Sequence, residues 1–131
     1  MKIVIYNEYN DFHRQGKTLQ AYPNGIHGAL KDLFEHAGHE VKTYTLEDIN
    51  TISDEVLKET DVMVWWGHCN HQDVTDETTN RIVESVLKGM GFVALHSSHL
   101  AKPFKRLMGT ACNLKWREID EKERVWVVNP A

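Results

Sequence analysis

Five consecutive apolar residues, VMVWW at positions 62–66, restrict the fold of this chain more than any other feature. Side chains alternate between the two faces of a strand, so a strand without polar positions is buried on both faces. Such strands lie in the interior of parallel sheets, whose two faces are covered by helices. The run therefore predicts a central parallel strand over residues 61–66.

Helix and strand patterns alternate along the rest of the chain. We predict further strands over residues 2–6, 40–44, 91–95 and 124–128. We predict helices where apolar residues recur with helical spacing between Ile26 and Ala37, after the capping residues Ser53 and Thr75, and over residues 102–108. The stretch 10–23 has no clear period. This order predicts an α/β fold, a flavodoxin-like doubly wound, mainly parallel sheet with helices on both faces, and such sheets bind ligands beyond the carboxyl ends of their strands.

Size and charge exclude several classes of protein. The chain has 131 residues and a formal net charge of −4, and a chain of this length buries a core without disulfides or structural metal. Binding to phosphates needs a basic surface, and no stripe of Lys and Arg is present, so we expect no nucleic-acid partner. The longest apolar run falls far short of a membrane span, and the amino terminus has no signal-peptide layout. We therefore expect a cytoplasmic protein without a membrane partner.

Half of the eight histidines follow two of the predicted strands. They form two His-x-x-His pairs, His68 with His71 and His96 with His99. Asn7 and Glu8 follow the first strand in the same way. Because the carboxyl ends of parallel strands meet at one edge of a sheet, we predict a shared functional site there. The alternative is that these residues are solvated loop residues or cap neighbouring helices.

Two chemical roles for this site stay open. Neutral imidazole moves protons near neutral pH without a metal, and the acid/base reading takes its catalytic groups from His68, His96, His99 and Glu8. Imidazole nitrogens also bind Zn²⁺ and similar divalent ions, and the metal reading takes its ligands from His68, His71, His96 and His99. The residues predicted to bind substrate are Asn7, Trp66, His71 and Ser97. A glycine-rich phosphate loop is missing, so we expect no tightly bound nucleotide.

Nucleophilic catalysis is a further alternative. Ser97 and Ser98 follow a buried strand, which is the setting of a nucleophile elbow, but a serine in front of a helix is more often an N-cap. Cys69 stands where a helix dipole would lower the pKa of its thiol, and the other reading is an inert loop thiol. Two cysteines in the whole chain are too few for a disulfide framework or a zinc ribbon.

Several motifs match one known family. They are Asn7-Glu8, YPNGIH at 22–27, VWWGH at 64–68, LHSSH at 95–99, KPFKRLMGT at 102–110 and LKWR at 114–117. Together they extend over essentially the whole chain and resemble the ThuA-like trehalose-utilisation family. The resemblance implies the fold of the class I glutamine amidotransferases. It also implies a role in the use of trehalose and related disaccharides through keto-sugar intermediates.

The resemblance shapes the functional expectations. The elbow residue of glutamine amidotransferases is a cysteine, whereas His96-Ser97 stands at the comparable place here, so we expect no Cys-dependent glutamine hydrolysis. We expect a sugar-metabolism enzyme acting on a disaccharide or keto-sugar, with a non-catalytic sugar-binding or regulatory domain as the alternative. Family members continue beyond this length, so residues 1–131 are expected to form one ThuA-like domain that is the N-terminal part of a longer one. Open sheet edges lead us to expect a homo-oligomer.

Overall fold

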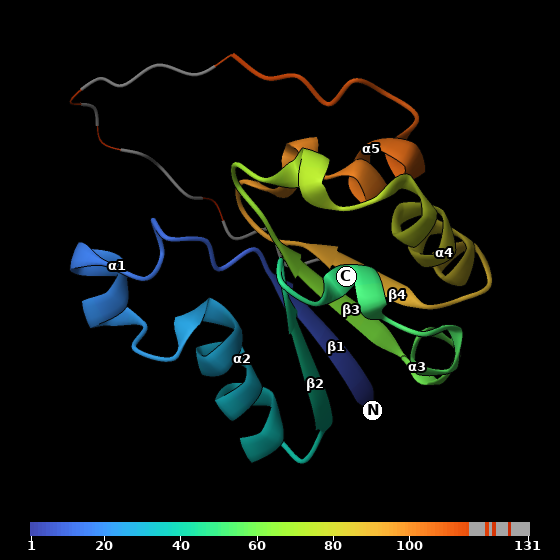
Figure 1. The fold of residues 1–131 in the computed structure, drawn as a ribbon, viewed down its shortest axis with the longest axis horizontal. Helices are drawn as coiled ribbons and strands as arrows, with labels where there is room; N and C mark the ends of the chain where they lie inside the picture. Colours follow the sequence, from blue (N-terminus) through green and yellow to red (C-terminus); the bar gives the residue numbers. More distant parts are fainter. Residues whose placement is uncertain (116–119, 121, 123–125, 127–131) are drawn as a thin grey trace.

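The computed structural model describes residues 1–115, 120, 122 and 126, and within them the chain forms a parallel sheet between two layers of helices (Figure 1). The strands are β1 (Lys2–Asn7), β2 (Glu40–Thr45), β3 (Val62–Trp66) and β4 (Gly91–Ala94), in the order β2-β1-β3-β4. All three strand pairs are parallel. The predicted α/β, flavodoxin-like fold is therefore confirmed. The strand predicted over 124–128 lies outside the described residues apart from Trp126.

The helices lie on opposite faces of this sheet. They are α1 (Gly16–Ala21), α2 (Gly25–His36), α3 (Asp54–Glu59), α4 (Asp76–Leu87) and α5 (Lys102–Met108). The single-turn 3₁₀ helices are η1 (Ile49–Thr51), η2 (His71–Asp73) and η3 (Ser98–Leu100). The connection from β1 leads through α2 to β2 on one side, and the chain then returns to place β3 on the other side of β1. The carboxyl ends of β1 and β3 are thus the switch point of the topology, where ligands of open α/β sheets bind.

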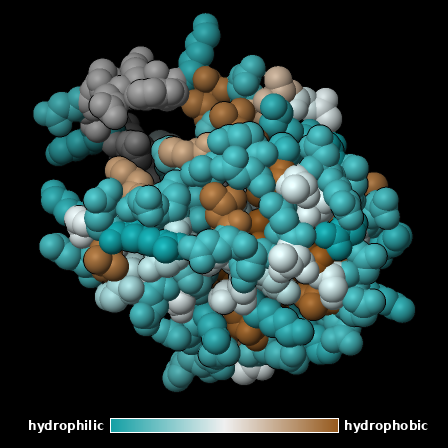
Figure 2. Space-filling model, viewed as in Figure 1, coloured by the Kyte–Doolittle hydropathy of each residue, from teal (hydrophilic) through white to brown (hydrophobic). Residues whose placement is uncertain are grey.

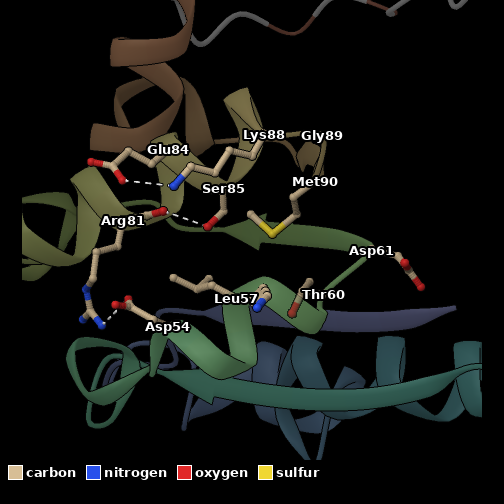
Figure 3. A pocket seen from close by; sticks show the side chains of 11 residues that line it. Asp54, Leu57, Thr60, Asp61, Arg81, Glu84, Ser85, Lys88, Gly89 and Met90 are labelled. Atoms are coloured by element: carbon tan, nitrogen blue, oxygen red, sulfur yellow. Dashed lines mark hydrogen bonds and ion pairs between the residues drawn. The ribbon is translucent and has the colours of Figure 1, made fainter.

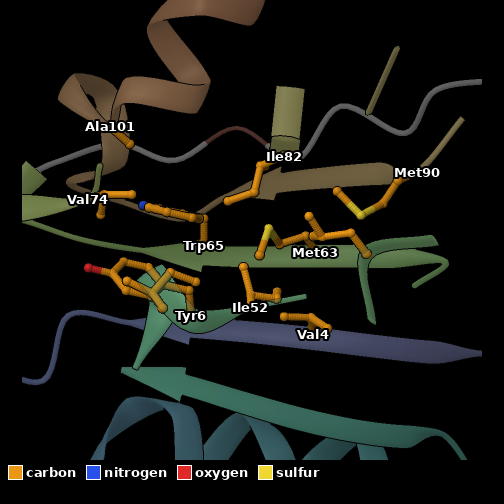
Figure 4. Packing of buried hydrophobic residues seen from close by; sticks show 11 residues of the cluster. Val4, Tyr6, Ile52, Met63, Trp65, Val74, Ile82, Met90 and Ala101 are labelled. Atoms are coloured by element: carbon orange, nitrogen blue, oxygen red, sulfur yellow. The ribbon is translucent and has the colours of Figure 1, made fainter. Parts of the chain in front are cut away.

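Alternation along the strands divides the core into two clusters. Ile3 and Ile5 of β1 belong to the cluster that packs against α2, which contributes Leu30 and Phe34. Val4 and Tyr6 face the opposite layer, where the larger cluster gathers (Figure 4). Its other buried members are Ile49, Ile52, Leu57, Met63, Trp65, Val74, Ile82, Met90 and Ala101. The central strands are therefore buried on both faces, as the apolar run at 62–66 predicts.

Local signals set the helix boundaries. The Ser53 hydroxyl accepts a hydrogen bond from Val56 N at 3.3 Å, and the Thr75 hydroxyl accepts one from Thr78 N at 3.1 Å, so both predicted N-caps are confirmed. Helix α1 was not predicted, because none of its residues is buried and it has no apolar stripe. Among the described residues, no helix combines the length and apolar character needed to cross a membrane.

Candidate functional site

Glu8 is the buried charge at the switch point. It directly follows β1 and is 1% exposed. Its carboxylate accepts hydrogen bonds from three consecutive backbone N–H groups: His68 N at 2.7 Å, Cys69 N at 3.0 Å and Asn70 N at 3.0 Å. The Asn10 side chain donates a further bond at 2.8 Å and also donates to Asn70 Oδ1. Cys69 N also donates to the other oxygen at 3.1 Å, so both carboxylate oxygens are held by the loop that follows β3.

This arrangement explains how the sequence positions the 68–70 loop. Successive backbone N–H groups that point to one centre form a cradle for an anion, and Glu8 supplies that anion from the neighbouring strand. Such charge-assisted hydrogen bonds are stronger than neutral ones. Glu8, predicted as a catalytic residue, is thus placed at the site with its oxygens turned to the backbone. In this structure its contacts are those of a residue that fixes the loop carrying His68 and His71.

Three of the four predicted histidines lie together. Burial lowers the pKa of the half-buried His71; the Glu8 carboxylate acts against that shift, and the nearby His99 and His68 add to it. The side chain of His68 is exposed and that of His99 is half-buried. His96 is exposed, and it is not among the groups that shift the pKa of His71. The structure therefore places His71 within electrostatic reach of His68, His99 and Glu8.

Two further histidines belong to this edge although sequence reasoning missed them. His13 is 4% exposed and packs edge-on against the Trp66 ring, with ring centroids 4.6 Å apart. His27, in the first turn of α2, has its Nδ1 atom 3.1 Å from Asn7 Oδ1. Burial is the main cause that lowers the pKa of both imidazoles. His13 lies in the stretch 10–23, which has no period from which its burial could be predicted. His27 lies in the YPNGIH motif, which was noted only for its resemblance to a family.

The two serines after β4 differ: Ser97 has an unusual backbone conformation, and Ser98 makes structural hydrogen bonds. Ser97 has a φ of 76°, in the left-handed region that non-glycine residues rarely occupy. The buried Ser98 hydroxyl accepts a hydrogen bond from Gly67 N at 3.1 Å and donates one to Trp65 O at 3.0 Å. Ser98 thus ties the end of β3 to the loop after β4, which favours a structural role over a nucleophilic one.

Cys69 is not an activated thiol. Burial raises its pKa, and the negative charge of Glu8 raises it further. The segment that follows is the short helix η2, and the backbone N–H groups that would favour a thiolate are directed at Glu8 instead. This direction argues against a thiol activated by a helix dipole and favours the inert-thiol reading.

The described side chains do not by themselves assemble a metal centre. Within residues 1–115, 120, 122 and 126, no group of three or more His, Cys, Asp or Glu side chains is placed to hold an ion. Glu8, the carboxylate nearest to the histidines, uses its oxygens for backbone N–H groups. The metal reading of His68, His71, His96 and His99 stays a prediction, and we assign no chemical step to a metal.

A hollow at the opposite edge of the sheet offers a less suitable site. It has a volume of about 610 Å³ and lies between α3 and α4, with Leu57 and Met90 among its lining residues (Figure 3). Two of its cations already pair: Arg81 contacts Asp54 at 3.3 Å, and Lys88 contacts Glu84 at 3.5 Å. The face shown in Figure 2 is largely hydrophilic, with apolar residues scattered between polar ones. The carboxyl edge therefore stays the candidate site.

The buried imidazoles predict that acid destabilises the protein. The pKa of His13, His27 and His71 is lowered by folding, so between that lowered pKa and the ordinary value near 6.5 the unfolded chain binds protons that the native state does not. Stability contributed by the neutral imidazoles is present above pH 6.5 and is lost as the pH falls. Urea unfolding at pH 7.5 and 5.5 should give the lower free energy of unfolding at pH 5.5.

A matched pair of variants tests the source of that difference. His71→Gln removes one buried imidazole and should reduce the loss of stability between pH 7.5 and 5.5. His36→Gln changes an exposed histidine at the end of α2 and should leave the loss unchanged. An equal loss in both variants and the parent would contradict the assignment to His71.

Comparisons with known proteins place the chain in a family. The comparison with curated proteins found no match. A family model named ThuA and described as Trehalose utilisation matches residues 2–130, nearly the whole chain. The motifs at 7–8, 22–27, 64–68 and 95–99, quoted from the sequence alone, all lie inside this match. The chain therefore belongs to the ThuA family, and its role is related to trehalose utilisation.

Proposed function

We propose that this protein is a sugar-metabolism enzyme that acts on a disaccharide or keto-sugar by histidine acid/base chemistry at the carboxyl ends of β1 and β3. The observation that carries the proposal is the gathering of His68, His71 and His99 beside the buried Glu8 carboxylate at the topological switch point. Family membership supports the sugar part of the proposal, and the geometry of the edge supports the chemical part.

The electrostatics of His71 suit a general base. Burial favours its neutral form, so an unprotonated imidazole is present before reaction. The Glu8 carboxylate acts in the opposite direction and stabilises the imidazolium formed when His71 takes a proton from a substrate hydroxyl. His68, exposed at the start of the same loop, is the proposed group that returns a proton to the product. The half-buried Trp66 adds an aromatic face of the kind on which a sugar ring packs.

A non-catalytic sugar-binding or regulatory domain is the second candidate. Its support is that the two oxygens of Glu8 and the hydroxyl of Ser98 are taken up by backbone groups. Under this candidate the histidines bind a sugar, and no bond of the sugar changes.

A substrate screen separates the two candidates. Purified protein is incubated with trehalose, maltose, sucrose and their keto derivatives, and products are followed by mass spectrometry and NMR. The enzyme proposal expects conversion of at least one sugar. Sugar binding without conversion contradicts it and favours the second candidate. Metal analysis of the same sample and repetition with a chelator test the metal reading, which requires stoichiometric metal and loss of conversion on chelation.

A further inference from the structure

Four buried nitrogen atoms at the carboxyl edge have no hydrogen-bond partner among the described residues. They are Asn7 Nδ2, His13 Nδ1, Trp65 Nε1 and His71 Nε2. Asn7 is 0% exposed, Trp65 1% and His13 4%. A buried polar atom without a partner destabilises the folded state, and native proteins keep few of them. Their concentration at one edge of a small domain points to a binding function.

The four atoms fall into two pairs. Asn7 and Trp66 are register partners in the β1–β3 pairing, and the His13 ring packs on Trp66, so Asn7 Nδ2 and His13 Nδ1 both lie around that indole. The second pair lies around Gly67. A side-chain carbon placed on Gly67 would come within 3.4 Å of both Trp65 Nε1 and the His71 ring. Figure 4 shows the indole nitrogen of Trp65 on the side of Val74.

Each pair combines the same two kinds of group. Asn7 Nδ2 and Trp65 Nε1 are N–H donors, whereas His13 and His71 each contribute an imidazole nitrogen. Burial favours neutral imidazoles, in which one nitrogen accepts and the other donates. A hydroxyl group both donates and accepts, so it satisfies a donor and an imidazole nitrogen together. Two such pairs suit a ligand that carries several hydroxyl groups.

The local charges disfavour an anionic ligand. Glu8 places a buried negative charge near both pairs, since it acts on the pKa of His13 and of His71. The neighbouring cations are already paired. Arg14 donates to Tyr9 O at 3.0 Å and to the Glu47 carboxylate, and Lys102 donates to Val74 O at 2.7 Å.

We infer that this edge binds an uncharged polyhydroxy compound, a free sugar in preference to its phosphate ester, and that His13 with Asn7 and Trp65 with His71 bind its hydroxyl groups. The inference rests on the proposed function for the identity of the ligand as a sugar. It adds His13 as a binding residue and predicts that the neutral sugar binds more tightly than its phosphate ester. Solvent does not reach the four nitrogens in this structure. Binding therefore requires neighbouring side chains to move aside.

Isothermal titration calorimetry tests the selectivity. The probes are trehalose, maltose and sucrose, the matched anion trehalose 6-phosphate, and the non-sugar polyols sorbitol and myo-inositol. We expect trehalose to bind at least tenfold more tightly than its 6-phosphate. Equal or tighter binding of the phosphate overturns the inference, even where conversion of that phosphate supports the proposed function. Binding of sorbitol or inositol without any sugar supports the inference and contradicts the proposed function. Failure of every neutral probe overturns the inference.

Two variants test the assigned nitrogens. His13→Phe keeps the edge contact with Trp66 and removes Nδ1, and Trp65→Phe keeps an aromatic ring in the core and removes Nε1. We expect His13→Phe to weaken binding of the best neutral probe at least tenfold without lowering the melting temperature, because it removes a buried nitrogen that has no partner in the unliganded protein. His36→Ala, at an exposed position of α2, should bind as the parent does. Unchanged affinity in folded His13→Phe and folded Trp65→Phe would overturn the assignment of the nitrogens.

Discussion

Replacing Glu8 with alanine should lower the free energy of unfolding by about 3 kcal/mol. The substitution removes the acceptor of three backbone N–H groups at residues 68–70 and of the Asn10 side chain. Hydrogen bonds to a charged group each contribute about 1.5–3 kcal/mol, and exposure of this loop lets water replace part of that loss. Urea unfolding followed by circular dichroism measures the difference.

Matched variants separate this effect from the loss of any carboxylate. Glu8→Gln keeps the volume of the side chain but turns a donor toward the backbone N–H groups, so an intermediate loss is expected. Glu35→Ala removes an exposed glutamate whose contact with Lys31 spans 3.9 Å, and surface pairs of this kind contribute less than about 1 kcal/mol. A Glu8→Ala variant as stable as Glu35→Ala would show that the Glu8 hydrogen bonds do not hold the loop.

Replacing His71 with alanine should lower kcat for the sugar identified in the screen by about 10²–10⁴-fold, the usual contribution of a general acid or base. The substitution removes the imidazole that burial keeps neutral and that the Glu8 carboxylate stabilises once it is protonated. Steady-state kinetics across pH 5.5–8.5 measure the loss. The acidic limb of the parent profile should disappear in His71→Ala, since that limb reports protonation of the base.

Controls for this prediction use other histidines of the chain. His36→Ala, on the exposed end of α2, should retain the parent kcat and pH profile. His96→Ala tests a predicted catalytic residue that is not among the groups acting on His71. A kcat unchanged in His71→Ala would remove His71 from the proposed chemistry. A rise in KM with unchanged kcat would instead give His71 the substrate-binding role predicted from the sequence.

The architecture follows from local patterns that survive in the tertiary structure. The apolar run at 62–66 predicts a central strand because strands covered on both faces need no polar positions, and β3 occupies that place. The caps at Ser53 and Thr75 depend on hydrogen bonds to groups three residues away, so sequence spacing alone reveals them. Parallel strands bring their carboxyl ends to one edge, which places Glu8 near His68 and His71.

Contacts between distant segments were beyond sequence reasoning. Glu8 is held by backbone N–H groups up to 62 residues away, and backbone groups leave no residue pattern to recognise. Burial and that same carboxylate raise the pKa of Cys69, and a local helix-dipole argument includes neither of them. His13 is buried by Trp66 from another strand, and no periodicity in the stretch 10–23 indicates this contact. The sequence thus predicts where in the fold the site lies, but not which groups contact Glu8 and His13.

The most direct test of the account is to locate the bound sugar on the protein. Titration of ¹⁵N-labelled protein with the sugar identified in the screen should shift the backbone amide signals of two segments at the carboxyl edge, Glu8–His13 and Gly67–His71. Signals from the hollow between α3 and α4, such as those of Lys58 and Ser85, should stay in place. Shifts confined to that hollow would contradict the assignment of the carboxyl edge as the functional site.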